Sequence, residues 1–135
     1  MGNTDKGLIG NNLIEEAISE LKNSFTEENL AIVLSIIRKR MNEKGQFVIG
    51  VDASEASNVS LSLKTVGFNG SKWFIAFTSF EEELKGKNGV MSAFLADIDQ
   101  IINITLKSEG IEGLILNPHG EMLTMNKSIL EVIVG

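Results

Sequence analysis

The chain has 135 residues, a length at which one domain can bury a continuous hydrophobic core. Hydrophobic residues make up 43% and charged residues 22% of it, which is typical of a folded globular protein and excludes a disordered one. No cysteine is present, so disulfides, thiolate zinc sites and thiol nucleophiles are excluded, and the formal net charge of −6 argues against nucleic-acid binding.

The N-terminal segment is polar and indicates a cytoplasmic protein. Residues 1–10 are expected to form a flexible lead, and residues 11–135 are expected to form a single domain. The opening residues Met1 to Gly7 contain no apolar signal core. No stretch approaches the ~20 apolar residues that span a bilayer, so we expect no membrane partner.

Two helices are predicted at the start of the domain. Apolar residues recur at offsets of three and four over residues 11–23, after a cap at Asn11 or Asn12. A second helix is expected to begin after a cap at Ser24 or Thr26 and to stop at Gly45. Its wide apolar face is typical of a helix that packs against both a sheet and another helix.

Strand patterns follow these helices. The β-rich run Phe47 to Val51 predicts a strand, and Asp52 to Asn58 predicts a loop. The alternation over Val59 to Val66 predicts a strand with one solvated face, and Gly67 to Ser71 predicts a turn. Lys72 to Thr78 is apolar on both faces, which predicts a central strand.

A short helix is predicted after Ser79. Ser79 and Glu82 have capping-box spacing, and Glu81 to Glu83 would place acid at the positive end of the helix dipole. The segment Gly86 to Gly89 is expected to end this helix. Val90 to Phe94 predicts a brief strand, and Leu95 to Ser108 predicts a third long helix.

The C-terminal part predicts a hairpin and a helix. Asn117-Pro118-His119-Gly120 fits a type I turn between a strand at 113–116 and an antiparallel strand at 122–125. Asn126 is expected to cap a final helix over 127–134. Together these elements predict an α+β fold, with a mixed and mostly antiparallel sheet packed by about four helices.

Three local signals carry a family resemblance. They are the strand-to-helix junction Phe77 to Leu84, the hairpin Gly113 to Glu121 and the helix start Asn126 to Leu130. In this order and spacing they resemble the SseB N-terminal domain family, over roughly residues 11–134. The resemblance implies a mixed antiparallel sheet packed by helices. The Gly86 to Gly89 segment departs from the family pattern, and we expect the additional C-terminal domain of longer members to be absent.

The resemblance implies structural roles and no catalytic ones. The family offers no established catalytic residues to transfer. The motif residues that it places in structural roles are Thr78, Ser79, Asn117, Pro118 and Gly120.

The sequence contains few residues that could carry out catalysis or bind a metal. His119 is the only histidine and falls at the tip of a predicted turn, so we expect no serine triad and no catalytic residue. The acidic residues Glu81, Glu82, Glu83, Asp97 and Asp99 have the wrong spacing for a shared metal, because adjacent helical residues face different directions. We therefore expect no metal, no cofactor and no enzyme activity.

Charge asymmetry predicts the kind of partner. Residues 46–135 contain eleven acidic and six basic side chains. We expect a non-catalytic intracellular protein-binding module of SseB-like type, with Glu81, Glu82, Glu83, Asp97 and Asp99 on an acidic surface that suits a basic protein.

Three other interpretations remain open at the level of sequence. One is an immunity protein that neutralises a cognate secreted toxin, and another is a carboxylate-based enzyme or small-ligand-binding domain. The third is a structural subunit in which Leu30 to Met41 form part of a dimer seam. The chain is accordingly expected to be a monomer or a weak homodimer.

Overall fold

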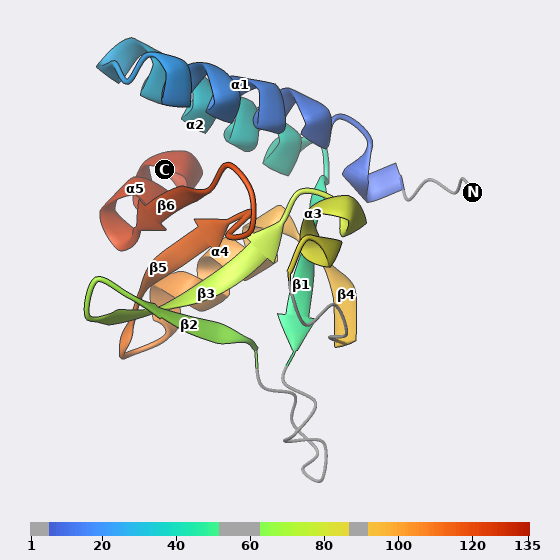
Figure 1. The fold of residues 1–135 in the computed structure, drawn as a ribbon, viewed down its shortest axis with the longest axis vertical. Coiled ribbons are helices and arrows are strands. Elements are labelled where there is room, and N and C mark those ends of the chain that lie inside the picture. The colour runs from blue at the N-terminus through green and yellow to red at the C-terminus, as the bar shows by residue number, and fades with distance from the viewer. Residues whose placement is uncertain (1–5, 52–62, 87–91) are drawn as a thin grey trace, which may run out of the picture.

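A computed structural model describes residues 6–51, 63–86 and 92–135 of the chain (Figure 1). The helices are the 3-10 turn η1 (Lys6–Leu8), α1 (Asn11–Asn23), α2 (Glu27–Asn42), α3 (Phe80–Leu84), α4 (Ile98–Lys107) and α5 (Lys127–Val134). The strands are β1 (Gln46–Val51), β2 (Thr65–Phe68), β3 (Ser71–Phe77), β4 (Ser92–Asp97), β5 (Ile111–Leu116) and β6 (Leu123–Asn126). These residues form an α+β fold, as predicted, with five α-helices where about four were expected.

The strands form one mixed sheet in the order β4-β1-β3-β5-β6. The pair β3–β5 is parallel, while β1–β3, β1–β4, β2–β3 and β5–β6 are antiparallel, so the expected mostly antiparallel sheet is confirmed. The strands β1 and β2 share one side of β3: β1 pairs with its last residues and β2 with its first. As predicted, β3 is therefore a central strand.

Helices and apolar strand residues form the main core on one face of the sheet. Side chains from α1, α2, α4 and α5 pack there against alternate residues of the central strands, such as Phe47, Phe74 and Leu114. The opposite face carries a second apolar cluster of Val48, Trp73, Ile75, Phe77 and Ile115. Because β3 contributes to both clusters, its sequence is apolar without alternation.

The strands β3, β4 and β5 all finish at the same end of the sheet, which we call this edge. Because β3 and β5 are parallel, their C-terminal ends lie at the same edge. The strand β4 also ends there, since Asp97 pairs with Gln46 at the start of β1. The segments that follow the adjacent strands β3 and β5 are therefore neighbours, although they are far apart in the sequence.

The described part of the N-terminal segment, residues 6–10, contacts the rest of the fold. Residues 6–10, which were expected in a flexible lead, include η1. Arg40 Nη2 donates to the Gly7 carbonyl (2.8 Å), which attaches this segment to α2. The first helix was expected to follow a cap at Asn11 or Asn12, but its N-cap is Gly10, and Asn11 lies inside the helix.

Two element predictions were wrong. Leu95 to Asp97 were assigned to a helix, but they belong to β4 and pair with β1. Gly67 and Phe68 were assigned to a turn, but they belong to β2, and the hairpin turn consists of Asn69 (φ 54°) and Gly70 (φ 79°).

Two sequence predictions lie outside the described residues in whole or in part. They are the strand over Val59 to Val66 together with its preceding loop, and the end of the segment Gly86 to Gly89 with the start of the strand over Val90 to Phe94. Among the helices in the described ranges, none has both the length and the apolar content needed to cross a bilayer.

Candidate functional site

The ends of the parallel strands are tied together by two buried polar residues. Thr78 follows β3 and Asn117 follows β5. Asn117 Oδ1 accepts a hydrogen bond from the Thr78 backbone N–H (2.9 Å), and Asn117 Nδ2 donates to Thr78 Oγ1 (3.1 Å). The Asn117 backbone N–H donates in turn to the Ala76 carbonyl (2.8 Å). These bonds satisfy polar groups that have no access to water at this edge.

The turn after β5 begins with a left-handed residue. Asn117 has φ 55°, a conformation that asparagine adopts more readily than other non-glycine residues. The Gly120 backbone N–H donates to the Asn117 carbonyl (3.1 Å), which closes the turn expected over these four residues. Pro118 is half-buried at the second position.

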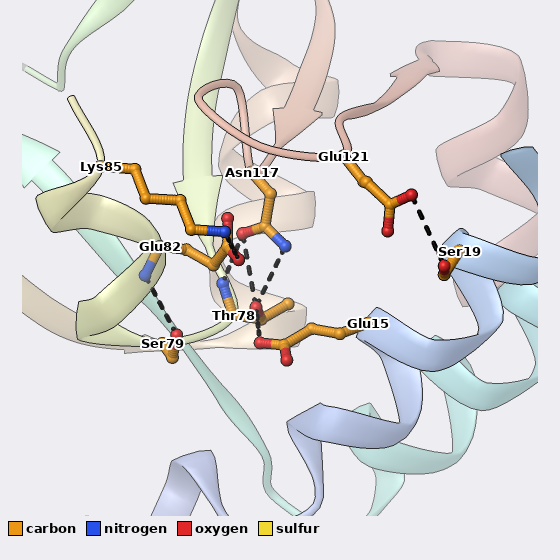
Figure 2. Close-up of polar contacts among 8 residues, drawn as sticks. All are labelled: Glu15, Ser19, Thr78, Ser79, Glu82, Lys85, Asn117 and Glu121. Atoms are coloured by element: carbon orange, nitrogen blue, oxygen red, sulfur yellow. Dashed lines mark hydrogen bonds and ion pairs between the residues drawn. The ribbon is translucent and has the colours of Figure 1, made fainter.

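A polar stripe on α1 faces this edge. Asn11, Glu15 and Ser19 are spaced at four residues and so lie on one side of the helix. Thr78 Oγ1 donates to Glu15 Oε2, and Ser19 Oγ lies 3.5 Å from Glu121 Oε2. Figure 2 shows Glu15 extending from α1 toward Thr78. The stripe brings a carboxylate of α1 to the ends of the parallel strands.

Asn11 and Arg40 hold α1 in this position. The buried Asn11 side chain donates to the Gln46 carbonyl (2.8 Å) and to the Thr78 carbonyl (3.0 Å). Its Oδ1 accepts from Nε of the buried Arg40 (3.0 Å). The helix hairpin is thereby fixed to the starts and ends of two adjacent strands.

Glu82 pairs with Lys85, and two further carboxylates, Glu15 and Glu121, lie on neighbouring segments. We call Glu15 of α1, Glu82 of α3, Glu121 of the turn and Lys85 the acidic cluster (Figure 2). Lys85 Nζ lies 2.7 Å from Glu82 Oε2. The hydrogen bond that Lys85 donates to Glu82 raises the pKa of Lys85, with further contributions from the charges of Glu82, Glu15 and Glu121. The negative charge here exceeds what Lys85 neutralises.

The side chain of Glu82 lies against the turn that follows β5. Its Oε1 is buried and has no hydrogen-bond partner among the described residues. A Cβ at position 120 would lie 2.6 Å from this oxygen, so glycine allows the turn to approach the carboxylate closely. The Glu82 backbone N–H donates to Ser79 Oγ (3.2 Å), which is the N-cap expected from the sequence.

The predicted acidic residues do not share one surface. Glu81 is exposed, Glu82 is partly buried, and Glu83 is only 6% exposed, so Glu83 offers little surface to a partner. Asp97 is the N-cap of α4 and accepts from Gln46 Nε2 (3.0 Å), and Asp99 is exposed in the first turn of α4. Because β1 lies between β4 and β3, the structure places these aspartates away from α3.

Sequence reasoning missed three members of the cluster. Glu15, Lys85 and Glu121 were not among the predicted site residues. The spacing of Asn11, Glu15 and Ser19 is a signal that could have indicated a functional or buried polar face on the first helix. Nothing local marks Glu121 beyond its place after the turn.

His119 is exposed, as expected, and its ring packs on the buried Phe77 with centroids 5.6 Å apart. A Cβ at Gly86 would lie 2.7 Å from His119 Nε2, so the ring fills the space between the turn and the end of α3.

Within residues 6–51, 63–86 and 92–135, no three acidic or histidine side chains converge to form a metal site. The carboxylates of the acidic cluster can accept hydrogen bonds from cationic groups and form ion pairs with them.

Comparisons with known proteins gave no match: no family model, curated protein or solved structure is significantly similar to this chain.

Proposed function

We propose that this chain is a non-catalytic intracellular protein-binding module of SseB-like type, and that its acidic cluster receives a basic protein partner. The observation that carries the proposal is the excess of acid at this end of the sheet, where Glu82 pairs with Lys85, Glu15 binds Thr78 and Glu121 binds Ser19. Glu121 and Lys85 are exposed, so a partner can reach this charge. Electrostatic complementarity of this kind accelerates association and selects the sign of the partner's charge.

The SseB-like part of the proposal is supported by the placement of the motif residues. Thr78 and Asn117 bind each other across the ends of β3 and β5, and Ser79 caps α3. Gly120 permits close contact with Glu82. Residues that hold two loops in place fit the structural roles that the family resemblance implies.

An immunity protein is a specific form of the same proposal. Its partner would be a secreted toxin with a basic active site, and the acidic cluster would cover that site. The cluster supplies the required sign of charge on side chains that come from three separate segments.

A capture experiment with matched charge reversals tests the proposed function. The cluster variant carries Glu121→Lys, within the acidic cluster, and Glu81→Lys, at the exposed position of α3 beside it. The control carries Glu109→Lys and Glu112→Lys, two exposed positions at the opposite edge of the sheet. Both variants change the net charge equally, and all four side chains are exposed, so both are expected to fold.

The wild-type chain and the control are expected to retain a saturable partner at low salt and to release it at high salt. The cluster variant is expected to lose that partner. The absence of any saturable partner, or equal retention by the cluster variant, would contradict the proposal.

A further inference from the structure

The short helix α3 has an inverted distribution of side chains. Its large apolar residues are in solvent, since Phe80 is 39% and Leu84 is 62% exposed, while Glu83 is 6% exposed. A folding helix normally buries the apolar residues and exposes the charged one. Local departures from this rule that combine an exposed apolar pair with a buried charge are typical of functional sites.

The exposed residues of α3 form one continuous arc. At 100° per residue, Phe80 and Leu84 lie on the same side of the helix, Glu81 follows next around the helix, and then Lys85 and Glu82. The apolar pair therefore borders an exposed carboxylate and, beyond it, the acidic cluster. In Figure 1, α3 lies at the end of β3 on the opposite side of the sheet from α4.

We propose that the exposed arc of α3 is a docking surface for a basic amphipathic protein segment, in which apolar side chains are flanked by lysine or arginine. This inference rests on the proposed function and identifies the surface and the chemistry of the partner. Phe80 and Leu84 contact the apolar side chains of that segment. Glu81 and the acidic cluster contact its cationic side chains.

Charge complementarity selects this occupant. An acidic apolar segment would meet Glu81, Glu121 and Glu15 with like charge, which costs affinity. An anionic membrane surface is disfavoured for the same reason, because basic residues are what bind such a surface. A second copy of this chain would present the same acidic cluster to itself if α3 met α3.

The two parts of the surface have different kinetic roles. The carboxylates steer the partner and raise the association rate, so this rate falls with added salt. The apolar pair is removed from water in the complex and slows dissociation. Loss of the apolar pair is therefore expected to raise the dissociation rate while leaving the salt dependence of association unchanged.

The test uses the full chain, labelled with ¹⁵N, and three synthetic peptides of equal length. One is an amphipathic peptide of leucine and lysine, one is an amphipathic peptide of leucine and glutamate, and one contains lysine alone. The leucine–lysine peptide is expected to bind saturably and to shift the amide signals of α3 and of residues 117–121. The leucine–glutamate peptide is expected not to bind, and the lysine peptide is expected to bind at least about tenfold more weakly.

A pair of variants tests the apolar contact. The variant with Phe80→Ser and Leu84→Ser is expected to bind the leucine–lysine peptide about tenfold or more weakly. The control is Phe25→Ser, which removes a phenylalanine that is 77% exposed between α1 and α2, and it is expected to bind as the wild type does. Amide spectra of the free variants check that each remains folded.

The outcomes separate this inference from the proposed function. Binding that maps away from α3, that survives the Phe80 and Leu84 substitutions, or that is equally strong for the lysine peptide overturns the docking surface. Absence of binding by all three peptides also overturns it. The proposed function is decided separately by the capture experiment, in which the Glu81 and Glu121 reversals retain or lose the partner.

Discussion

At the scale of single residues, Asn117 combines a backbone requirement with a hydrogen-bonding one. Its left-handed backbone turns the chain at the end of β5, and its amide side chain binds Thr78 at the end of β3. Few residues meet both requirements. Glycine would meet the first and not the second, whereas alanine would meet neither.

We predict that Asn117→Ala lowers the free energy of unfolding by about 2–4 kcal/mol. Of this, about 1–3 kcal/mol comes from the unpaired buried Thr78 groups, and about 1 kcal/mol comes from the left-handed backbone. Asn117→Gly is expected to lose about 1 kcal/mol less, because its backbone is unstrained. Urea unfolding of the three proteins measures both differences. Equal midpoints for the alanine and glycine variants would disprove the backbone part of the argument.

Lys85 provides a second residue-scale prediction. Glu82→Gln is expected to lower the pKa of Lys85 toward its ordinary value, because the hydrogen bond that Lys85 donates to the Glu82 carboxylate is the largest cause of the raised pKa. Since the folded-state pKa is raised, the protonated Lys85 stabilises the fold below the ordinary lysine pKa, and that contribution is lost as the pH rises through the raised value.

An NMR titration of the Lys85 side chain measures this pKa. The control is Glu43→Gln, at the C-terminal end of α2, where Lys39 and Arg40 lower the pKa of Glu43 through their hydrogen bonds. That substitution is expected to leave the pKa of Lys85 unchanged. An unchanged Lys85 pKa in the Glu82→Gln protein would show that the ion pair is not formed in solution.

At the scale of elements, the contact between β5 and β6 depends on a glycine. A Cβ at Gly113 would lie 2.1 Å from the Met125 carbonyl oxygen and 2.7 Å from the Asn126 Cα, both of which are backbone atoms. We predict that Gly113→Ala lowers the free energy of unfolding by at least about 2 kcal/mol, because the strands must separate.

The matched control is Gly67→Ala on β2, where a Cβ would meet nothing within 4 Å. This variant is expected to be as stable as the wild type or more stable by up to about 1 kcal/mol. Calorimetric or urea unfolding measures both variants. A Gly113→Ala protein as stable as the Gly67→Ala protein would refute the close approach of β5 and β6.

Most elements could be predicted from local signals, and the exceptions have a common cause. Caps at Thr26, Ser79 and Asn126 mark helix starts because their side chains bind backbone groups within three residues. Leu95 to Asp97 carry no such marker. A short apolar run fits a strand and a buried helix equally well, and pairing with β1 decides between them.

At the scale of the whole molecule, the sheet order was not predictable from the sequence. The parallel pair β3–β5 joins strands that are separated by α3, β4 and α4, and no local pattern encodes that pairing. The site depends on it directly. Glu15 and Glu121 lie near Lys85 only because α1 and the turn after β5 reach the same edge as α3.

The docking surface is also a property of the whole fold. The sequence around Phe80 and Leu84 is that of an ordinary short helix. Only the packed structure shows that Glu83 is buried while these two apolar residues are exposed. Charge counts along the chain indicated a basic partner. They could not indicate that the carboxylates of the acidic cluster come from α1, α3 and the segment after β5.

The position of β3 between β1 and β2 on one side and β5 on the other has a consequence for synthesis. Chains are made from the N-terminus, so β3 leaves the ribosome before β5 does, and the two cannot pair until β5 has also emerged. During that interval one edge of an apolar strand has no neighbour, and such an edge promotes association between nascent chains. The central strand that stabilises the finished sheet is therefore exposed to wrong pairing during translation.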